Sequence, residues 1–166
     1  SGIYSGTGPF TVWDIEGESH LAWRKKKSGQ PFFGLINFSE THESGLMRHD
    51  GKIHSESHRQ TIAFRQKAKL NGASITDPKL VNLEPYYPDL PELRTDIAQH
   101  YNNIHKMDKR VGRILKDLAA DNLEKDTVII WTSDHGDGLP RAKRELYDSG
   151  INVPMIIAGN QNQSSA

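Results

Sequence analysis

The 166-residue chain has no cysteine, no net charge and no long hydrophobic run. Without cysteine it can have no disulfide scaffold, no cysteine-ligated zinc site and no cysteine nucleophile within this stretch. Its 21 basic and 21 acidic side chains balance, which argues against a general nucleic-acid binder or a membrane-surface protein. The longest strongly apolar runs cover residues 128–131 and 153–158, far short of the ~20 residues of a membrane span. The length and the 35% hydrophobic content instead fit one globular domain.

The apolar pattern changes along the chain from short runs to a helical period and back. Apolar residues recur every three or four positions between Pro91 and Asp121, which predicts one long amphipathic helix. Short apolar runs at residues 31–38, 127–134 and 153–158 predict buried strands. A strand, a long helix and another strand are typical of a right-handed crossover between parallel strands. We therefore predict an α/β fold with a mostly parallel sheet and flanking helices.

The remaining segments carry weaker signals. Residues 55–70 could form a short helix, and residues 141–148 a short helix or turn. Residues 1–31 and 71–91 show no regular period, and prolines punctuate the second of these stretches.

Two polar clusters follow predicted strands, at the edge where open α/β sheets bind ligands. Residues 39–43 (SETHE) follow the first strand, and residues 132–138 (TSDHGDG) follow the second. If these strands are parallel neighbours, His42 shares one crevice with Asp134 and His135. A carboxylate oxygen beside an imidazole nitrogen suits a divalent metal ion, although an ordinary strand-to-loop turn has the same composition.

Basic residues near the second cluster are candidates for binding an anion. Arg141, Lys143 and Arg144 lie within four residues and could hold a tetrahedral oxyanion through charge-assisted hydrogen bonds. The alternative is an exposed basic turn. Arg24, near the tryptophans at positions 13 and 23, could line a substrate pocket or belong to a packed loop.

The block from residue 127 to residue 154 has a distinctive pattern. The run TVIIWTSDHGDG at residues 127–138 is followed by Lys143, by Tyr147-Asp148 and by Val153-Pro154. This pattern resembles the formylglycine-dependent sulfatases of the alkaline phosphatase superfamily. Residues 13–14, 31–44 and 86–94 are similar to that family too. The overall likeness runs from about residue 13 to residue 159 and is greatest to the bacterial branch related to heparan N-sulfatases.

The resemblance implies a role for each candidate residue. In that family a hydrated formylglycine attacks sulfur, and a divalent ion, usually calcium, polarises the sulfate oxygens. Asp134 and His135 match two of the metal ligands, Lys143 matches the lysine that contacts the sulfate, and His42 matches the histidine on the leaving-group side. The implied substrate is a sulfated carbohydrate or an aryl sulfate, and the implied location is periplasmic, extracellular or lysosomal.

The family's other landmarks are not found in these residues. A Cys- or Ser-x-Pro-Ser-Arg nucleophile motif and an early aspartate pair are lacking. We expect them, and with them the formylglycine, upstream of Ser1. Residues 1–160 would then be the later part of a sulfatase catalytic domain, and residues 161–166 a polar tail. On this interpretation the isolated chain is inactive, and an open sheet edge makes it poorly soluble.

Two other functions remain open from the sequence. A phosphatase or phosphonate hydrolase of the same superfamily also carries an Asp-His-Gly sequence after a strand. A non-catalytic module that binds anionic glycans through His42, Lys143 and Arg144 is the other alternative, although such binders tend to be basic.

Overall fold

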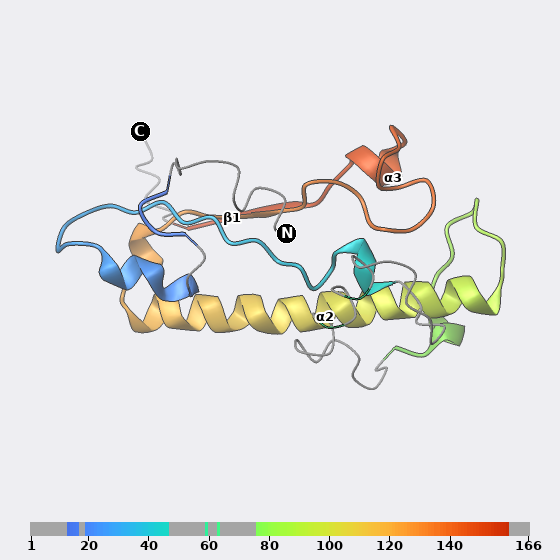
Figure 1. The fold of residues 1–166 in the computed structure, drawn as a ribbon, viewed down its shortest axis with the longest axis horizontal. Coiled ribbons are helices and arrows are strands. Elements are labelled where there is room, and N and C mark those ends of the chain that lie inside the picture. Colours follow the sequence, from blue (N-terminus) through green and yellow to red (C-terminus); the bar gives the residue numbers. More distant parts are fainter. Residues whose placement is uncertain (1–12, 17–18, 47–58, 60–62, 64–75, 160–166) are drawn as a thin grey trace, which may run out of the picture.

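The computed structural model describes residues 13–16, 19–46, 59, 63 and 76–159. Its central element is α2 (Pro91–Ala120), a 30-residue helix along which the other segments lie (Figure 1). Pro91 occupies the first turn, where its missing N–H costs no hydrogen bond. The helix ends at Asp121, and Asn122 then takes a left-handed conformation with a φ of 58°. The helix predicted for residues 91–121 is therefore confirmed.

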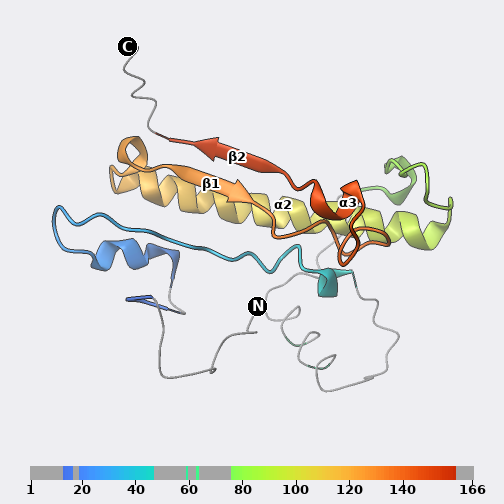
Figure 2. The same ribbon diagram turned by 90° about the horizontal axis from the view of Figure 1, so that it is seen from above.

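Two short strands run along α2 (Figure 2). They are β1 (Ile129–Thr132) and β2 (Met155–Ala158), and they lie within the runs that predicted strands. They pair antiparallel, with Ile129 opposite Ala158 and Thr132 opposite Met155. The chain turns back at α3 (Asp148–Ile151) between them, so the second strand runs against the first.

The mostly parallel sheet predicted from the sequence is not found in the described residues. Within them the antiparallel pair is the whole sheet. The described residues therefore combine helices and strands, as predicted, but without parallel strands. Side chains project from the two faces of the sheet, and several apolar ones on this pair are open to solvent. The cross-strand partners Ile130 and Ile157 are 62% and 64% exposed.

The strand predicted over residues 31–38 is wrong. This segment is extended but makes no strand ladder, and Phe33 and Leu35 are 79% and 63% exposed. Side-chain contacts hold its ends: Phe32 packs on Trp23, and Arg110 of α2 lies over the ring of Phe38. The apolar composition favours an extended chain, but a strand also needs a partner backbone, and no described segment supplies one.

The apolar core lies against the first half of α2 and joins three segments of the chain. Its buried members are Val81, Ile97, Ala98 and Leu139. Partly buried side chains that pack against them are Leu46, Leu83, Tyr87 and Leu93. Leu139 comes from the loop after β1, and Leu46 follows residues 39–45. The core therefore holds both predicted site segments against the same part of α2.

Short 3-10 helices complete the described fold. They are η1 (His20–Lys25), η2 (Glu43–Gly45), η3 (Pro78–Leu80) and η4 (Glu124–Asp126). The helix predicted for residues 55–70 lies outside the described residues, except for Arg59 and Ala63, which are helical. The segment predicted as a short helix or turn over 141–148 is a turn that leads into α3. In the part of the chain that the structure describes, no helix is both long and apolar enough to cross a membrane.

Candidate active site

Two segments far apart in the sequence meet beside the core. One is residues 39–46, which includes η2, and the other is the loop between β1 and α3. Gly138 makes this contact possible, because a Cβ there would lie 2.5 Å from the Cβ of Glu43 and 2.8 Å from its Cα. These separations are too short for any side chain at position 138. The two backbones therefore approach more closely than an alanine would allow.

Glu43 links these segments through ion pairs. Its carboxylate lies 3.1 Å from Lys143 Nζ and accepts two 2.8 Å hydrogen bonds from the guanidinium of Arg144. The side chains of Glu43 and Lys143 are 19% and 16% exposed, whereas that of Arg144 is 68% exposed. The hydrogen bonds from Arg144 and then Lys143 lower the pKa of Glu43 from 4.5 to about 2, against an opposing effect of burial. Two of the three cations predicted to bind an anion, Lys143 and Arg144, thus converge on one carboxylate.

His42 precedes η2 and lies within electrostatic reach of the loop after β1. Its Nδ1 accepts a 3.2 Å hydrogen bond from the backbone N–H of Ser44, so neutral His42 carries its proton on Nε2. Partial burial lowers the pKa of His42, and the positive charge of Lys143 lowers it further. Glu43 acts in the opposite direction. Because His42 is adjacent to Glu43, it lies beside the ion pair of Glu43 with Lys143.

Asp134 and His135 follow β1 and place a carboxylate oxygen near an imidazole nitrogen. Asp134 Oδ2 lies 3.6 Å from His135 Nε2, and the Asp134 side chain is 87% exposed. His135 Nδ1 lies 2.6 Å from the Gly136 carbonyl oxygen and donates its proton to it, which leaves a lone pair on Nε2. Two ligand atoms on one Ca²⁺ ion, at bond lengths of about 2.3–2.6 Å, lie roughly 3–4 Å apart.

The Asp134 and His135 pair therefore fits one shared divalent cation. Among the residues that the structure describes, no group of three His, Cys, Asp or Glu side chains could hold such an ion. Within the described residues the candidate ligands are therefore this one pair.

Asp137 fixes the path of the loop between the Asp134–His135 pair and Lys143. Its carboxylate accepts the backbone N–H of Leu139 at 2.9 Å, and its carbonyl accepts that of Lys143 at 3.0 Å. Gly136 donates its N–H to the Gly150 carbonyl at 2.9 Å. The loop is therefore tied both to itself and to α3, and it turns Lys143 towards Glu43.

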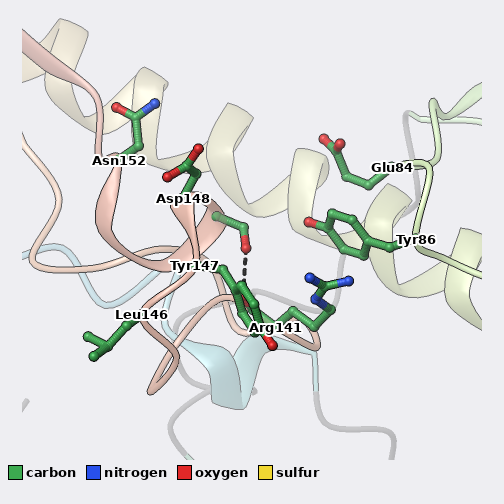
Figure 3. Close-up of a pocket in the computed structure, with 8 residues that line it drawn as sticks. Glu84, Tyr86, Arg141, Leu146, Tyr147, Asp148 and Asn152 are labelled. Carbon is green, nitrogen blue, oxygen red and sulfur yellow. Dashed lines mark hydrogen bonds between the residues drawn. The ribbon is translucent and has the colours of Figure 1, made fainter.

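Arg141 lies on the same loop, beside a pocket of about 610 Å³ (Figure 3). Its guanidinium lies over the rings of Tyr86 and Tyr147, 4.5 Å and 4.3 Å from their centroids. Arg141 and Arg144 have φ values of 66° and 74°, in a left-handed region that residues other than glycine rarely adopt. The loop thus holds two arginines in an uncommon backbone conformation.

Arg24 does not join this site. Its Nε donates to Asp121 Oδ2 at 2.7 Å, and Trp23 Nε1 donates to the same oxygen at 2.7 Å. Asp121 ends α2, whereas Glu40, beside His42, pairs with Arg110. The rise along α2 from Arg110 to Asp121 is about 16 Å. These contacts anchor η1 to the end of α2, and a role of Arg24 in a substrate pocket stays a prediction.

Glu43, Asp137 and Tyr86 shape the site, although the sequence did not single them out. The Asp137-Gly138 pair is a turn signal that predicts the bend before Lys143. Glu43 is adjacent to His42, but its partners lie about 100 positions away, and no local pattern reveals such a contact. Tyr86 belongs to a proline-rich loop whose path depends on tertiary packing.

Comparison with known proteins identifies the class to which this fold and site belong. Residues 18–166 match the family model for sulfatases. The chain therefore belongs to the sulfatase family.

Curated relatives agree with this assignment. The chain is 38% identical over 170 residues to an ulvan-active sulfatase of Formosa agariphila. The aligned stretch covers 93% of this chain and 28% of that protein. It is 26% identical over 141 residues to the N-sulphoglucosamine sulphohydrolase of Homo sapiens. This second alignment covers 80% of this chain and 26% of that protein. The chain thus spans about a quarter of the length of these relatives. No solved structure matches it significantly.

Proposed function

We propose that this chain forms part of the active site of a hydrolase that cleaves sulfuric esters or sulfamates of sulfated carbohydrates. The observation that carries the proposal is the junction at which Glu43, the neighbour of His42, contacts Gly138 and Lys143 of the loop that also carries Asp134 and His135, in a member of the sulfatase family. The names of the relatives support the substrate class, because one acts on ulvan and another on N-sulphoglucosamine. By the same analogy we propose a periplasmic, extracellular or lysosomal location.

Lys143 would bind the sulfate while remaining paired with Glu43. An ammonium group has three N–H donors, and Glu43 occupies one of them through a 3.1 Å contact. Two donors remain for sulfate oxygens. Because Glu43 also fixes the position of Nζ, the cation would not need to be reoriented when the substrate binds.

His42 would serve the leaving group. The acid would be its imidazolium form, which donates the Nε2 proton and returns to neutral imidazole, while Ser44 Oγ, 2.9 Å from Nδ1, can accept the other ring proton. A sugar alkoxide is a poor leaving group, and a positioned acid that donates a proton to it accelerates the cleavage.

Asp134 and His135 would hold a divalent cation, and calcium is the ion that we propose. When bound, this cation would polarise the sulfate oxygens and stabilise negative charge in the transition state. The free Nε2 lone pair of His135 and the exposed carboxylate of Asp134 fit this role. The formylglycine that supplies the attacking oxygen in the family is expected outside these 166 residues.

Substrate selectivity tests the proposal. The protein expressed from the complete reading frame that contains this sequence is assayed with 4-methylumbelliferyl sulfate and with 4-methylumbelliferyl phosphate, each with added Ca²⁺ and with EGTA. We expect cleavage of the sulfate that is lost in EGTA and restored by Ca²⁺. Preference for the phosphate would replace the proposal with a phosphatase. No hydrolysis of either ester, together with retention on immobilised heparin that Lys143→Ala abolishes, would replace it with a glycan-binding module.

A further inference from the structure

The pocket beside Arg141 has a composition different from that of the junction at Glu43. Its volume is about 610 Å³, within the ~300–1,000 Å³ range typical of small-ligand sites. Glu84 and Tyr86 come from the segment before α2. Arg141 comes from the loop after β1, Asp148 begins α3, and Asn152 follows its last residue (Figure 3). The lining therefore combines one cation, two carboxylates and an amide with aromatic rings.

Arg141 is held in place without an acidic partner. The rings of Tyr86 and Tyr147 lie on its guanidinium, at 4.5 Å and 4.3 Å. In the described part of the chain no carboxylate forms an ion pair with it, whereas Lys143 and Arg144 both pair with Glu43. Its five N–H donors are thus oriented by stacking and remain available to a ligand.

The polar groups of the pocket match a ligand that both donates and accepts hydrogen bonds. The carboxylates of Glu84 and Asp148 can only accept, Arg141 can only donate, and the Asn152 amide can do both. A sulfate dianion has no proton to donate, and sulfate or phosphate alike would be repelled by two carboxylates. Sugar hydroxyls donate and accept, and a sugar ring also presents an apolar face to tyrosine.

The pocket is close enough to the junction for one substrate to reach both. Arg141 precedes Lys143 by two residues, so their Cα atoms are at most about 7 Å apart. Tyr86 and Arg141 also line a neighbouring hollow that Glu43 borders. A glycan with its sulfate at Lys143 would therefore extend past Arg141.

We infer that this pocket is a subsite for the sugar unit next to the one that carries the cleaved sulfate, bound through its hydroxyl groups. The inference rests on the proposed sulfatase function. Asn152 is the sharpest probe, because its side chain has no hydrogen bond within the described residues and lies on the surface. Tyr86→Ala probes the opposite wall of the pocket.

The test compares kcat/KM for sulfated oligosaccharides with kcat/KM for 4-methylumbelliferyl sulfate, which has no sugar. The protein from the complete reading frame is assayed on oligosaccharides of ulvan, heparan sulfate and chondroitin sulfate, and the best substrate is used. We expect the oligosaccharide-to-aryl ratio to fall at least tenfold in Asn152→Ala and in Tyr86→Ala. The control Tyr101→Ala removes a 42% exposed ring of α2 outside the pocket and should leave the ratio unchanged.

Each result has one meaning. A ratio in Asn152→Ala within threefold of that of the unmodified protein would overturn the subsite. Cleavage of the aryl sulfate but of none of the oligosaccharides would also overturn it, while sulfatase activity would stand. Failure to cleave any sulfate would overturn the proposed function and the subsite with it.

Discussion

The ion pairs of Glu43 provide a quantitative prediction about the loop junction. Replacing Glu43 with glutamine keeps the shape of the side chain and removes the charge that Lys143 and Arg144 share. The two cations are then left facing each other without a carboxylate between them. We therefore expect Glu43→Gln to destabilise the junction.

The magnitude follows from the lowered pKa of Glu43. A change from 4.5 to about 2 corresponds to about 3 kcal/mol in favour of the folded state at neutral pH. Arg144 is 68% exposed, so solvent screens part of this effect, and about 1–2 kcal/mol is expected. Since the pKa is lowered in the folded state, the stabilisation is fully present above pH 4.5 and disappears as the pH falls towards 2.

Urea denaturation followed by tryptophan fluorescence measures this effect on the 166-residue chain. At pH 7 the Glu43→Gln variant should lose about 1–2 kcal/mol of unfolding free energy, or roughly 2–8 °C in melting temperature. The matched control is Glu145→Gln, an exposed glutamate with no ion pair in the described part of the chain. A difference between Glu43→Gln and the parent chain that is the same at pH 7 and pH 2.5 would refute the reasoning.

Three further predictions follow from the same structure. Gly138→Ala places a Cβ 2.5 Å from that of Glu43 and should lower the unfolding free energy measured in urea by about 1–3 kcal/mol. Gly112→Ala has open space around it inside α2 and should raise that free energy by about 0.5–1 kcal/mol. Equal effects of the two changes would argue against the close approach at Gly138. Asp134→Ala should weaken Ca²⁺ binding at least tenfold in calorimetric titration. The control Asp108→Ala, on α2, should leave the Ca²⁺ affinity unchanged. The same affinity in both variants would show that Asp134 is not a ligand. Replacing the exposed cross-strand pair Ile130 and Ile157 with threonine should reduce aggregation of the isolated chain and its binding of a hydrophobic dye, and unchanged aggregation would show that another surface is responsible.

The elements that depend on local sequence were predictable. The three-to-four-residue period between Pro91 and Asp121 is a property of the segment itself, and α2 has nearly those bounds. The runs that contain β1 and β2 are likewise short, apolar and β-branched, and they form strands.

Strand pairing was not predictable, because it depends on segments far apart in the chain. Residues 31–38 have the composition of a strand but no ladder, and β1 pairs with β2 in the antiparallel direction. The sequence pattern fixes which residues favour an extended backbone but not which neighbour they will have.

The candidate site shows the same division. The cluster after β1 and the basic run at residues 141–144 carry their chemistry in adjacent residues, and the sequence singled out both. The role of Glu43 depends on contacts across about 100 positions. The ion pair of Arg24 with Asp121 at the far end of α2 is likewise a contact across about 100 positions that no local pattern predicts.

The most direct test of the central claim is the activity of a Lys143→Ala variant. The protein from the complete reading frame is assayed for hydrolysis of 4-methylumbelliferyl sulfate, with Lys125→Ala in η4 as a control that removes a lysine elsewhere. If Lys143 binds the sulfate, its loss should lower kcat/KM by about a hundredfold or more, while Lys125→Ala should retain the activity of the unmodified protein. An unchanged kcat/KM in Lys143→Ala would contradict the assignment of this loop junction as the sulfate site.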